Sequence, residues 1–121
     1  MPSTPETLAE HRHCMTMHGR EVYRSAVRTM TALGAEMGAG GFDLLIAHQA
    51  NLRINEMVQR TLELPAEKVF NNIQKYANTT AATIPIALDE CRKAGRVKDG
   101  ALIAFVGLGA GYHWGAALMR A

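Results

Sequence analysis

The sequence has few cysteines, few aromatic residues and no excess of one charge. Cys14 and Cys91 are the only cysteines among 121 residues, and aromatic residues make up 6%. Two cysteines so far apart form no disulfide framework and match no zinc or redox pair, which favours a reducing compartment. Lysine and arginine number 13 against 11 acidic residues, so the net charge of +2 argues against a dedicated nucleic-acid or membrane-surface binder.

Long apolar runs are also missing. No stretch approaches ~18 apolar residues, and the segment from Met1 to Glu10 lacks the basic and apolar parts of a signal peptide. We therefore expect a soluble, cytoplasmic protein. The residues that are present, 48% hydrophobic and 20% charged, are typical of one globular domain.

The first 16 residues are polar and show no periodicity, and Pro2 and Pro5 discourage regular structure there. We expect an N-terminal arm at 1–16 and one domain at 17–121. The arm and the first two residues after it contain four residues of types that bind zinc, namely His11, His13, Cys14 and His18. Since no partner pair follows at finger-like spacing, a solvated arm is favoured over a metal site.

Helical and strand patterns alternate along the rest of the chain. Helices are predicted from Arg20 to the glycines at 38, 40 and 41, from about residue 52 to Pro65, and from about residue 79 to Gly95. Pro85 predicts a kink or a late start in the third helix. Strands are predicted at 42–47, 69–73, 101–106 and 114–119. This order indicates an α/β fold in which the last two strands form a hairpin.

A glycine-rich segment, Gly107 to Gly111, joins the last two predicted strands. It is neither a P-loop nor a dinucleotide fingerprint, because no Gly-Lys-Ser/Thr and no helix follow it. Two interpretations stay open. A hairpin that needs positive φ angles is favoured on local grounds, and the other is a backbone that closely approaches a ligand.

His48 and Asn78 stand where two predicted strands or turns lead into helices. The carboxyl ends of strands in α/β folds commonly hold binding and catalytic groups. Each residue also has an ordinary structural interpretation, since a lone histidine is often buried and Asn78, like Asn51, can cap the following helix. If they converge, His48 and Asn78 supply the two hydrogen-bond donors that a developing oxyanion or enolate requires.

Three motifs together resemble a known enzyme family. They are His48-Gln49-Ala50-Asn51-Leu52-Arg53-Ile54, the segment from Asn78-Thr79-Thr80-Ala81-Ala82 to Asp89-Glu90, and the segment from Gly107 to Gly115 with Trp114. In order and spacing, the chain from about Met17 to Arg120 is similar to the C-terminal half of 3-oxoacyl-[acyl-carrier-protein] synthase III. The resemblance implies a thiolase-like half-domain, a mixed β-sheet layered with helices.

The resemblance also implies a chemistry. His48 and Asn78 fall on the family's catalytic histidine and asparagine, which donate hydrogen bonds to the thioester oxygen of malonyl-acyl carrier protein. They stabilise the enolate that forms as carbon dioxide leaves, and this enolate attacks an acyl group held on a cysteine. The implied substrates are acyl-CoA and malonyl-acyl carrier protein, with no further cofactor and no metal.

Other matched positions imply binding roles. Substrate and pantetheine contacts are implied for Gly19, Asn51, Leu108 and Gly109. Docking of an acidic carrier protein is implied for Arg24, Arg53 and Arg60. Leu108 stands where the family usually has an aromatic residue, and Ala110 replaces a glycine, so the resemblance does not fix the shape of the acyl pocket.

The family's nucleophilic cysteine lies in the N-terminal half, to which nothing in this chain corresponds. Cys91 lies on the apolar face of a predicted helix, and Cys14 precedes the matched region. A covalent intermediate needs a nucleophile within reach of the donors. We therefore expect half of a condensing enzyme of fatty acid or polyketide synthesis, inactive alone. The alternative is a non-catalytic module that binds acyl-CoA or acyl carrier protein.

The third predicted helix suggests a partner chain. Its small and apolar residues are Ala81, Ala82, Ile84, Ala87 and Leu88. Left uncovered, this surface would exceed the apolar patch that soluble monomers usually expose. We therefore expect a homodimer or a complex with a separate N-terminal synthase half.

Overall fold

The computed structural model describes residues 3–14, 16–38 and 41–121. It contains a four-stranded mixed sheet with the order β2-β1-β3-β4. The strands are β1 (Leu44–Ala47), β2 (Val69–Phe70), β3 (Leu102–Gly109) and β4 (His113–Arg120). β1 pairs in parallel with β2 and β3, whereas β3 and β4 form an antiparallel hairpin. The predicted α/β class and the predicted hairpin are therefore confirmed.

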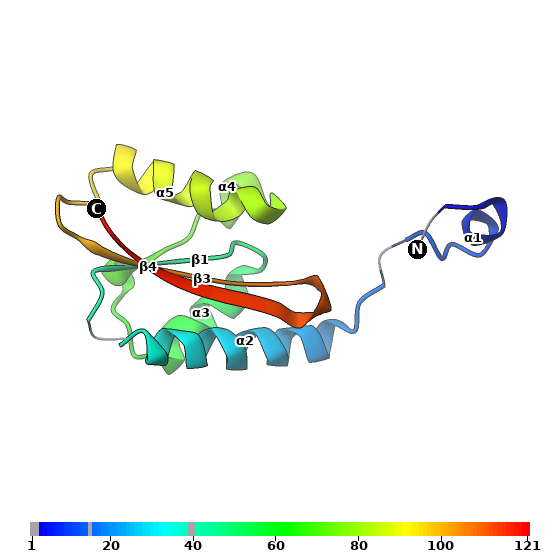
Figure 1. Cartoon of the computed structure of the whole chain (residues 1–121), viewed down its shortest axis with the longest axis horizontal. Coiled ribbons are helices and arrows are strands. Elements are labelled where there is room, and N and C mark those ends of the chain that lie inside the picture. Colours follow the sequence, from blue (N-terminus) through cyan, green and yellow to red (C-terminus); the bar gives the residue numbers. More distant parts are fainter. Residues whose placement is uncertain (1–2, 15, 39–40) are drawn as a thin grey trace.

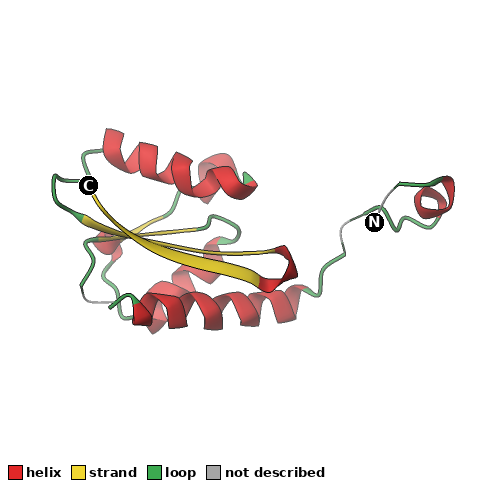
Figure 2. Ribbon diagram, viewed as in Figure 1, coloured by secondary structure: helices red, strands yellow, loops and turns green. Residues whose placement is uncertain are grey.

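Helices cover both faces of this sheet (Figures 1 and 2). α2 (Gly19–Glu36) and α3 (Leu52–Thr61) lie on one face, and α4 (Ile73–Tyr76) and α5 (Thr83–Lys93) lie on the other. Burial on both faces explains why β1 reads as an uninterrupted apolar run, since all four of its residues are buried.

Alternate strand residues supply two separate cores. On one face, Leu45 and Val106 pack with Met30 of α2 and Val58 of α3. On the other face, Ile46 and Ile103 pack with Ala87 and Cys91 of α5. The three- and four-residue spacing of the helical residues therefore predicts correctly which helix faces meet the sheet.

The helix ends follow the expected signals. α2 is followed by Gly38 with φ +76°, while Gly40 of the predicted glycine run lies outside the described residues. α5 begins only at Thr83, after a 3-10 turn at Thr80–Ala82, so the late start near Pro85 is confirmed. Proline is tolerated there because the first turn of a helix has no intrahelical partner for its N–H groups.

Two predicted boundaries in the strands change. β2 is only two residues long, because α4 begins at Ile73 within the predicted strand 69–73. β3 continues through the glycine-rich segment to Gly109, and the turn is a 3-10 segment at Ala110–Tyr112. Gly111 has φ +73°, but Gly107 and Gly109 do not have positive φ. The hairpin interpretation therefore explains only one glycine.

The N-terminal arm is not irregular, contrary to the prediction. α1 (Pro5–Ala9) is a short helix that extends away from the sheet (Figure 1). Thr4 and Thr7 form a capping box, and Pro5 occupies the first turn, where its missing N–H costs nothing. Met1, Pro2 and Met15 of the predicted arm lie outside the described residues.

The apolar face of α5 is covered by the chain's own sheet, which corrects the argument for a partner on this helix. Ala87 is fully buried, and Ile84 and Leu88 pack against the core beneath them. Ala81 and Ala82 are exposed, but they are small. No described helix is both long and apolar enough to cross a membrane.

Candidate active site

His48 lies where β1 ends, between β3 and the start of α5. Its backbone N–H donates to the Val106 carbonyl oxygen at 2.8 Å, which fixes the turn against β3. Its side chain is half-buried. Burial lowers the pKa of the imidazole, because the charged form loses hydration. Burial therefore favours the neutral form of the His48 imidazole.

Thr83 contacts this imidazole directly, a partner that the sequence patterns did not reveal. His48 Nδ1 and Thr83 Oγ1 lie 2.6 Å apart, within hydrogen-bond distance. Thr83 is the first residue of α5 and is buried. It shares a helical face with Ala87 and Cys91, four and eight residues later, so a hydroxyl on an otherwise apolar stripe was the available signal.

Asn78 lies in the loop that precedes the same helix. Its Oδ1 accepts a hydrogen bond from the Thr80 backbone N–H at 2.9 Å. Because a backbone N–H donates only to the oxygen of an amide, this bond assigns the orientation of the Asn78 side chain. Its amide nitrogen has no hydrogen-bond partner in the part of the chain that the structure describes.

The His48 and Asn78 donors approach the same helix start by different routes. His48 reaches Thr83 through its side chain, and Asn78 stands five residues before Thr83 in the chain. His48 Nε2, like the Asn78 amide nitrogen, has no partner among residues 3–14, 16–38 and 41–121. The arrangement therefore leaves one ring nitrogen and one amide nitrogen without a partner in the described structure.

Neighbouring polar residues are already engaged. Asn51 caps α3, since its Oδ1 accepts from the Arg53 backbone N–H at 3.0 Å. The buried Gln49 donates to the carbonyl oxygens of Ala47 and Phe70 and accepts from the Asn72 backbone N–H, at 2.8, 3.3 and 3.1 Å. Gln49 thus holds the turn after β1 against β2, and sequence reasoning gave it no role.

A second polar cluster ties α4 to α5. The Glu90 carboxylate accepts from Asn72 Nδ2 at 2.9 Å and from the Tyr76 hydroxyl at 2.8 Å, and it pairs with Lys75. Hydrogen bonds, the one from Lys75 first, lower the pKa of Glu90 to about 2. The cluster fixes the segment immediately before Asn78 relative to the helix that carries Thr83.

The predicted substrate-binding residues are spread over different surfaces. Gly109 lines an open groove on the α5 side of the hairpin, together with Ile84, Phe105 and Gly107. A Cβ atom at Gly107 would lie 3.5 Å from His48 Cβ, so Gly107 separates this groove from the histidine, which does not line it. Leu108 points to the opposite core instead.

Gly19 stands apart from that groove. It is the first residue of α2, it is exposed, and a Cβ atom added to it would meet nothing within 4 Å. The structure therefore does not bring Gly19 together with Gly109 and His48.

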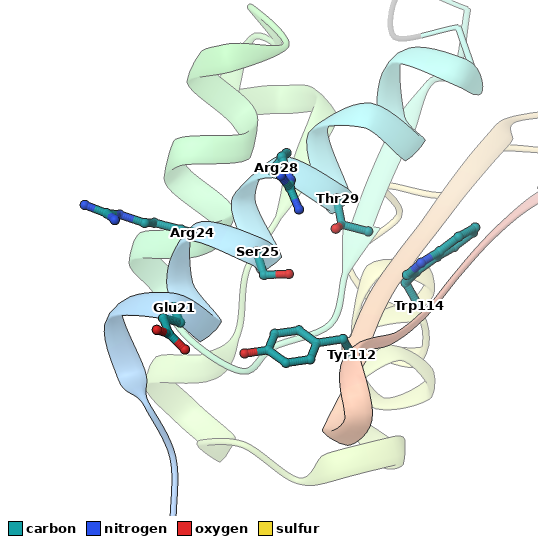
Figure 3. A pocket seen from close by; sticks show the side chains of 7 residues that line it. All are labelled: Glu21, Arg24, Ser25, Arg28, Thr29, Tyr112 and Trp114. Carbon is teal, nitrogen blue, oxygen red and sulfur yellow. The ribbon is translucent and has the colours of Figure 1, made fainter.

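The predicted docking arginines all lie in the α2–α3 layer. Arg53 and Arg60 are exposed on α3, seven residues apart. Arg24 lines an open groove between α2 and the hairpin. Figure 3 shows Tyr112 pointing toward α2 in this groove, while Arg24 extends outward from it. The three cations therefore share one layer of the molecule.

Neither cysteine is placed as a nucleophile for this site. Cys91 is buried in the core under α5, and desolvation raises the pKa of its thiol to about 11. Cys14 is exposed on the arm, where its Sγ lies 3.6 Å from His13 Nε2. Among the described residues, no group of three His, Cys, Asp or Glu side chains could hold a metal ion.

Comparison with known proteins identifies the family of this chain. Residues 34–121 match the family described as 3-oxoacyl-[acyl-carrier-protein (ACP)] synthase III C terminal. The chain belongs to the 3-oxoacyl-[acyl-carrier-protein] synthase III family. His48, Asn78 and the hairpin all fall within the matched residues of this synthase III domain.

Curated relatives of synthase III are much longer than this chain. The synthase III of Symbiobacterium thermophilum is 42% identical, over 99% of this chain and 38% of its own length. The chloroplastic synthase III B of Cuphea wrightii is 47% identical, over 88% of this chain and 28% of its own length. The chain therefore spans about a third of the relatives that it matches.

Solved structures match the fold equally well. The synthase III of Aquifex aeolicus superposes with a TM-score of 0.82 at 48% identity, covering 88% of this chain and 36% of that one. The priming β-ketosynthase of the R1128 polyketide pathway gives 0.79 at 28% identity, over 87% and 34%. The four-stranded sheet and its helices thus correspond to one part of a synthase III enzyme.

Proposed function

We propose that this chain is the donor-bearing C-terminal half of a decarboxylating condensing enzyme of fatty acid or polyketide biosynthesis. One observation carries the proposal. His48 lies in the turn from β1 to α3 and contacts Thr83, the first residue of α5, through its imidazole, and Asn78 lies in the loop that leads into α5. Neither His48 Nε2 nor the Asn78 amide nitrogen has a partner in the described structure. Two such donors suit an oxygen on which negative charge develops.

In the proposed reaction, His48 and Asn78 donate to the thioester oxygen of a malonyl group carried by acyl carrier protein. The bond between the carboxylate carbon and the α-carbon breaks, and its electron pair forms the enolate as carbon dioxide leaves. The enolate carbon then attacks an acyl thioester on a cysteine, and the cysteine thiolate leaves. A neutral His48 suits this role because an uncharged imidazole N–H donates without proton transfer.

Pantetheine and carrier would use different surfaces of this chain. Gly107 and Gly109 line the groove on the α5 side of the hairpin, and we propose that this groove takes the pantetheine arm. Gly19 and Leu108 lie away from it and are not assigned to it. We propose that the carrier protein binds to Arg24, Arg53 and Arg60, because exposed cations attract an acidic partner.

The nucleophilic cysteine would come from an N-terminal synthase half. Cys91 is buried with a raised thiol pKa, and Cys14 lies on the arm, so we propose that such a half completes the enzyme. The surface that favours contact is β4, where Trp114 and Leu118 are exposed. Grooves border β4 on both faces, and Trp114 lines each of them.

Reconstitution tests this function. The chain is mixed with the cysteine-bearing N-terminal part of the Aquifex aeolicus enzyme, and carbon dioxide release from malonyl-acyl carrier protein is measured. We expect release only from the mixture. His48→Ala and Asn78→Ala should each reduce it by 10²–10³-fold, the scale of losing one oxyanion donor.

His18→Ala is the matched control, because His18 is exposed ahead of α2 and makes no side-chain capping bond. It should leave the rate unchanged. If the mixture forms a stable complex and binds acyl-CoA but releases no carbon dioxide, the proposal fails. The chain would then be a binding module for acyl-CoA or acyl carrier protein, the function favoured by its lack of a placed nucleophile.

A further inference from the structure

We propose that Thr83 is a positioning residue that fixes the neutral tautomer of His48 with its proton on Nε2. This tautomer makes Nε2 a donor and Nδ1 an acceptor. This inference rests on the proposed function only in assuming that the Nε2–H group donates to a substrate oxygen.

The argument starts from the hydroxyl of Thr83. Thr83 is 3% exposed, and His48 Nδ1, at 2.6 Å, is its side chain's one hydrogen-bond partner among the residues that the structure describes. A buried hydroxyl that donates to nothing loses its hydrogen bond to water without compensation. The hydroxyl proton must therefore point to Nδ1, which can accept only when it carries no proton.

Both partners are held in place by their backbones. The Thr83 backbone N–H donates to the Thr80 carbonyl oxygen, and the residue begins α5, whose Ala87 and Cys91 are fully buried. The His48 backbone N–H donates to Val106. Neither group needs to reorganise when a ligand arrives, so the donor direction is set before binding.

A nearby threonine provides a matched control. The Thr79 Oγ1 atom is also buried, but it has no hydrogen-bond partner in the described structure. Thr79→Val and Thr83→Val make the same isosteric change four residues apart. Only the second removes a hydrogen bond to His48, so a general loss of packing or polarity would affect both variants.

The test is a nitrogen NMR measurement on the isolated chain near neutral pH. Ring nitrogens with and without a proton have clearly different ¹⁵N chemical shifts, so the spectrum identifies the tautomer of His48. We expect Nε2 to carry the proton in the wild type, in Thr83→Ser and in Thr79→Val. In Thr83→Val, we expect both tautomers to be populated.

Protonated Nδ1 in the wild type, or a Thr83→Val spectrum identical to the wild type, would overturn the inference. In the reconstituted enzyme, Thr83→Val should lower the rate by less than His48→Ala, and Thr83→Ser should restore it. If the tautomers behave as expected while every mixture is inactive, the proposed function fails and the positioning of His48 by Thr83 stands.

Discussion

The two edge strands of the sheet, β2 and β4, differ in length and in what covers them. β2 is two residues long, and Arg96 covers it by donating to the carbonyl oxygens of Glu67 at 2.6 Å and Val69 at 3.3 Å. β4 is eight residues long, and seven of them are exposed. Trp114 and Leu118 are 62% and 47% exposed on it, without a charged side chain between them.

An open apolar edge strand is a template for pairing, and folded proteins usually block such edges with charge, bulges or a covering segment. The β2 edge is blocked by this chain's own residues, and the β4 edge is not. The difference teaches that contacts within this chain close the β2 side of the fold, where Gln49 holds the turn after β1 and Glu90 ties α4 to α5. The β4 edge is where we expect a partner, in a chain that spans about a third of its relatives.

The largest expected effect concerns the β2 side of the fold, where Gln49 holds the turn after β1. Gln49→Ala removes three hydrogen bonds from a buried side chain to the Ala47 and Phe70 carbonyl oxygens and the Asn72 N–H. We expect the free energy of unfolding to fall by about 3 kcal/mol in a urea titration. Gln74→Ala, which removes an exposed bond on α4, should change it by less than about 0.5 kcal/mol. Equal losses would show that the turn after β1 is not held by Gln49.

The next effect concerns the open side. We expect the isolated chain to scatter light as a species larger than 13.2 kDa at micromolar concentration, because β4 is uncovered. Trp114→Lys should weaken this association about tenfold or more, since a buried unpaired charge costs over 1.4 kcal/mol. Leu8→Lys, at another exposed apolar residue on α1, is the control. A monodisperse monomer of the wild type would remove β4 as an interface.

A smaller effect is expected for the residue that blocks β2. Arg96→Met keeps an unbranched side chain but loses both bonds to carbonyl oxygens, together with the guanidinium that lies 5.2 Å from the centroid of the Phe70 ring. The free energy of unfolding should fall by about 1 kcal/mol. Arg92→Met, an exposed change on α5, should fall within about 0.5 kcal/mol of the wild type. If the two variants have the same free energy of unfolding, the bonds of Arg96 do not stabilise the β2 edge.

The smallest expected effect is a pH dependence of the free energy of unfolding, caused by Glu90. Lys75, Asn72 and Tyr76 hold the pKa of Glu90 at about 2, below its ordinary value of 4.5. A lowered carboxyl pKa contributes stability above about pH 4.5, and this contribution is lost as the pH falls toward 2. The difference in unfolding free energy between the wild type and Glu90→Gln should therefore shrink over that range. A difference that is independent of pH would contradict this account.

Much of the fold could be predicted from the sequence because local signals agree with burial. The run from Leu44 to Ala47 and the spacing of Ala87 and Cys91 specify buried elements. The prediction of an irregular arm is wrong because Pro5 does not break a helix when it occupies the first turn, as it does in α1. The prediction that a partner chain covers α5 is wrong because periodicity shows that a helix face is buried, but not what buries it. Here the chain's own sheet covers this face.

The candidate site was predictable to a lesser degree. Motif resemblance singled out His48 and Asn78, and local rules identified the cap made by Asn51. The bond from Thr83 to His48 joins residues 35 positions apart, so no local spacing could reveal it. The three bonds of Gln49 likewise depend on how β1, β2 and α4 meet in space.

The central claim is that this chain supplies the two donors but not the nucleophile. Intact-mass spectrometry after incubation with acetyl-CoA tests it most directly, on the chain alone and on the mixture with the cysteine-bearing half. We predict that the acyl group appears only on the added half, and that both Cys14 and Cys91 stay unmodified. One acyl group per chain on either of these cysteines, formed without the added half, would contradict the claim.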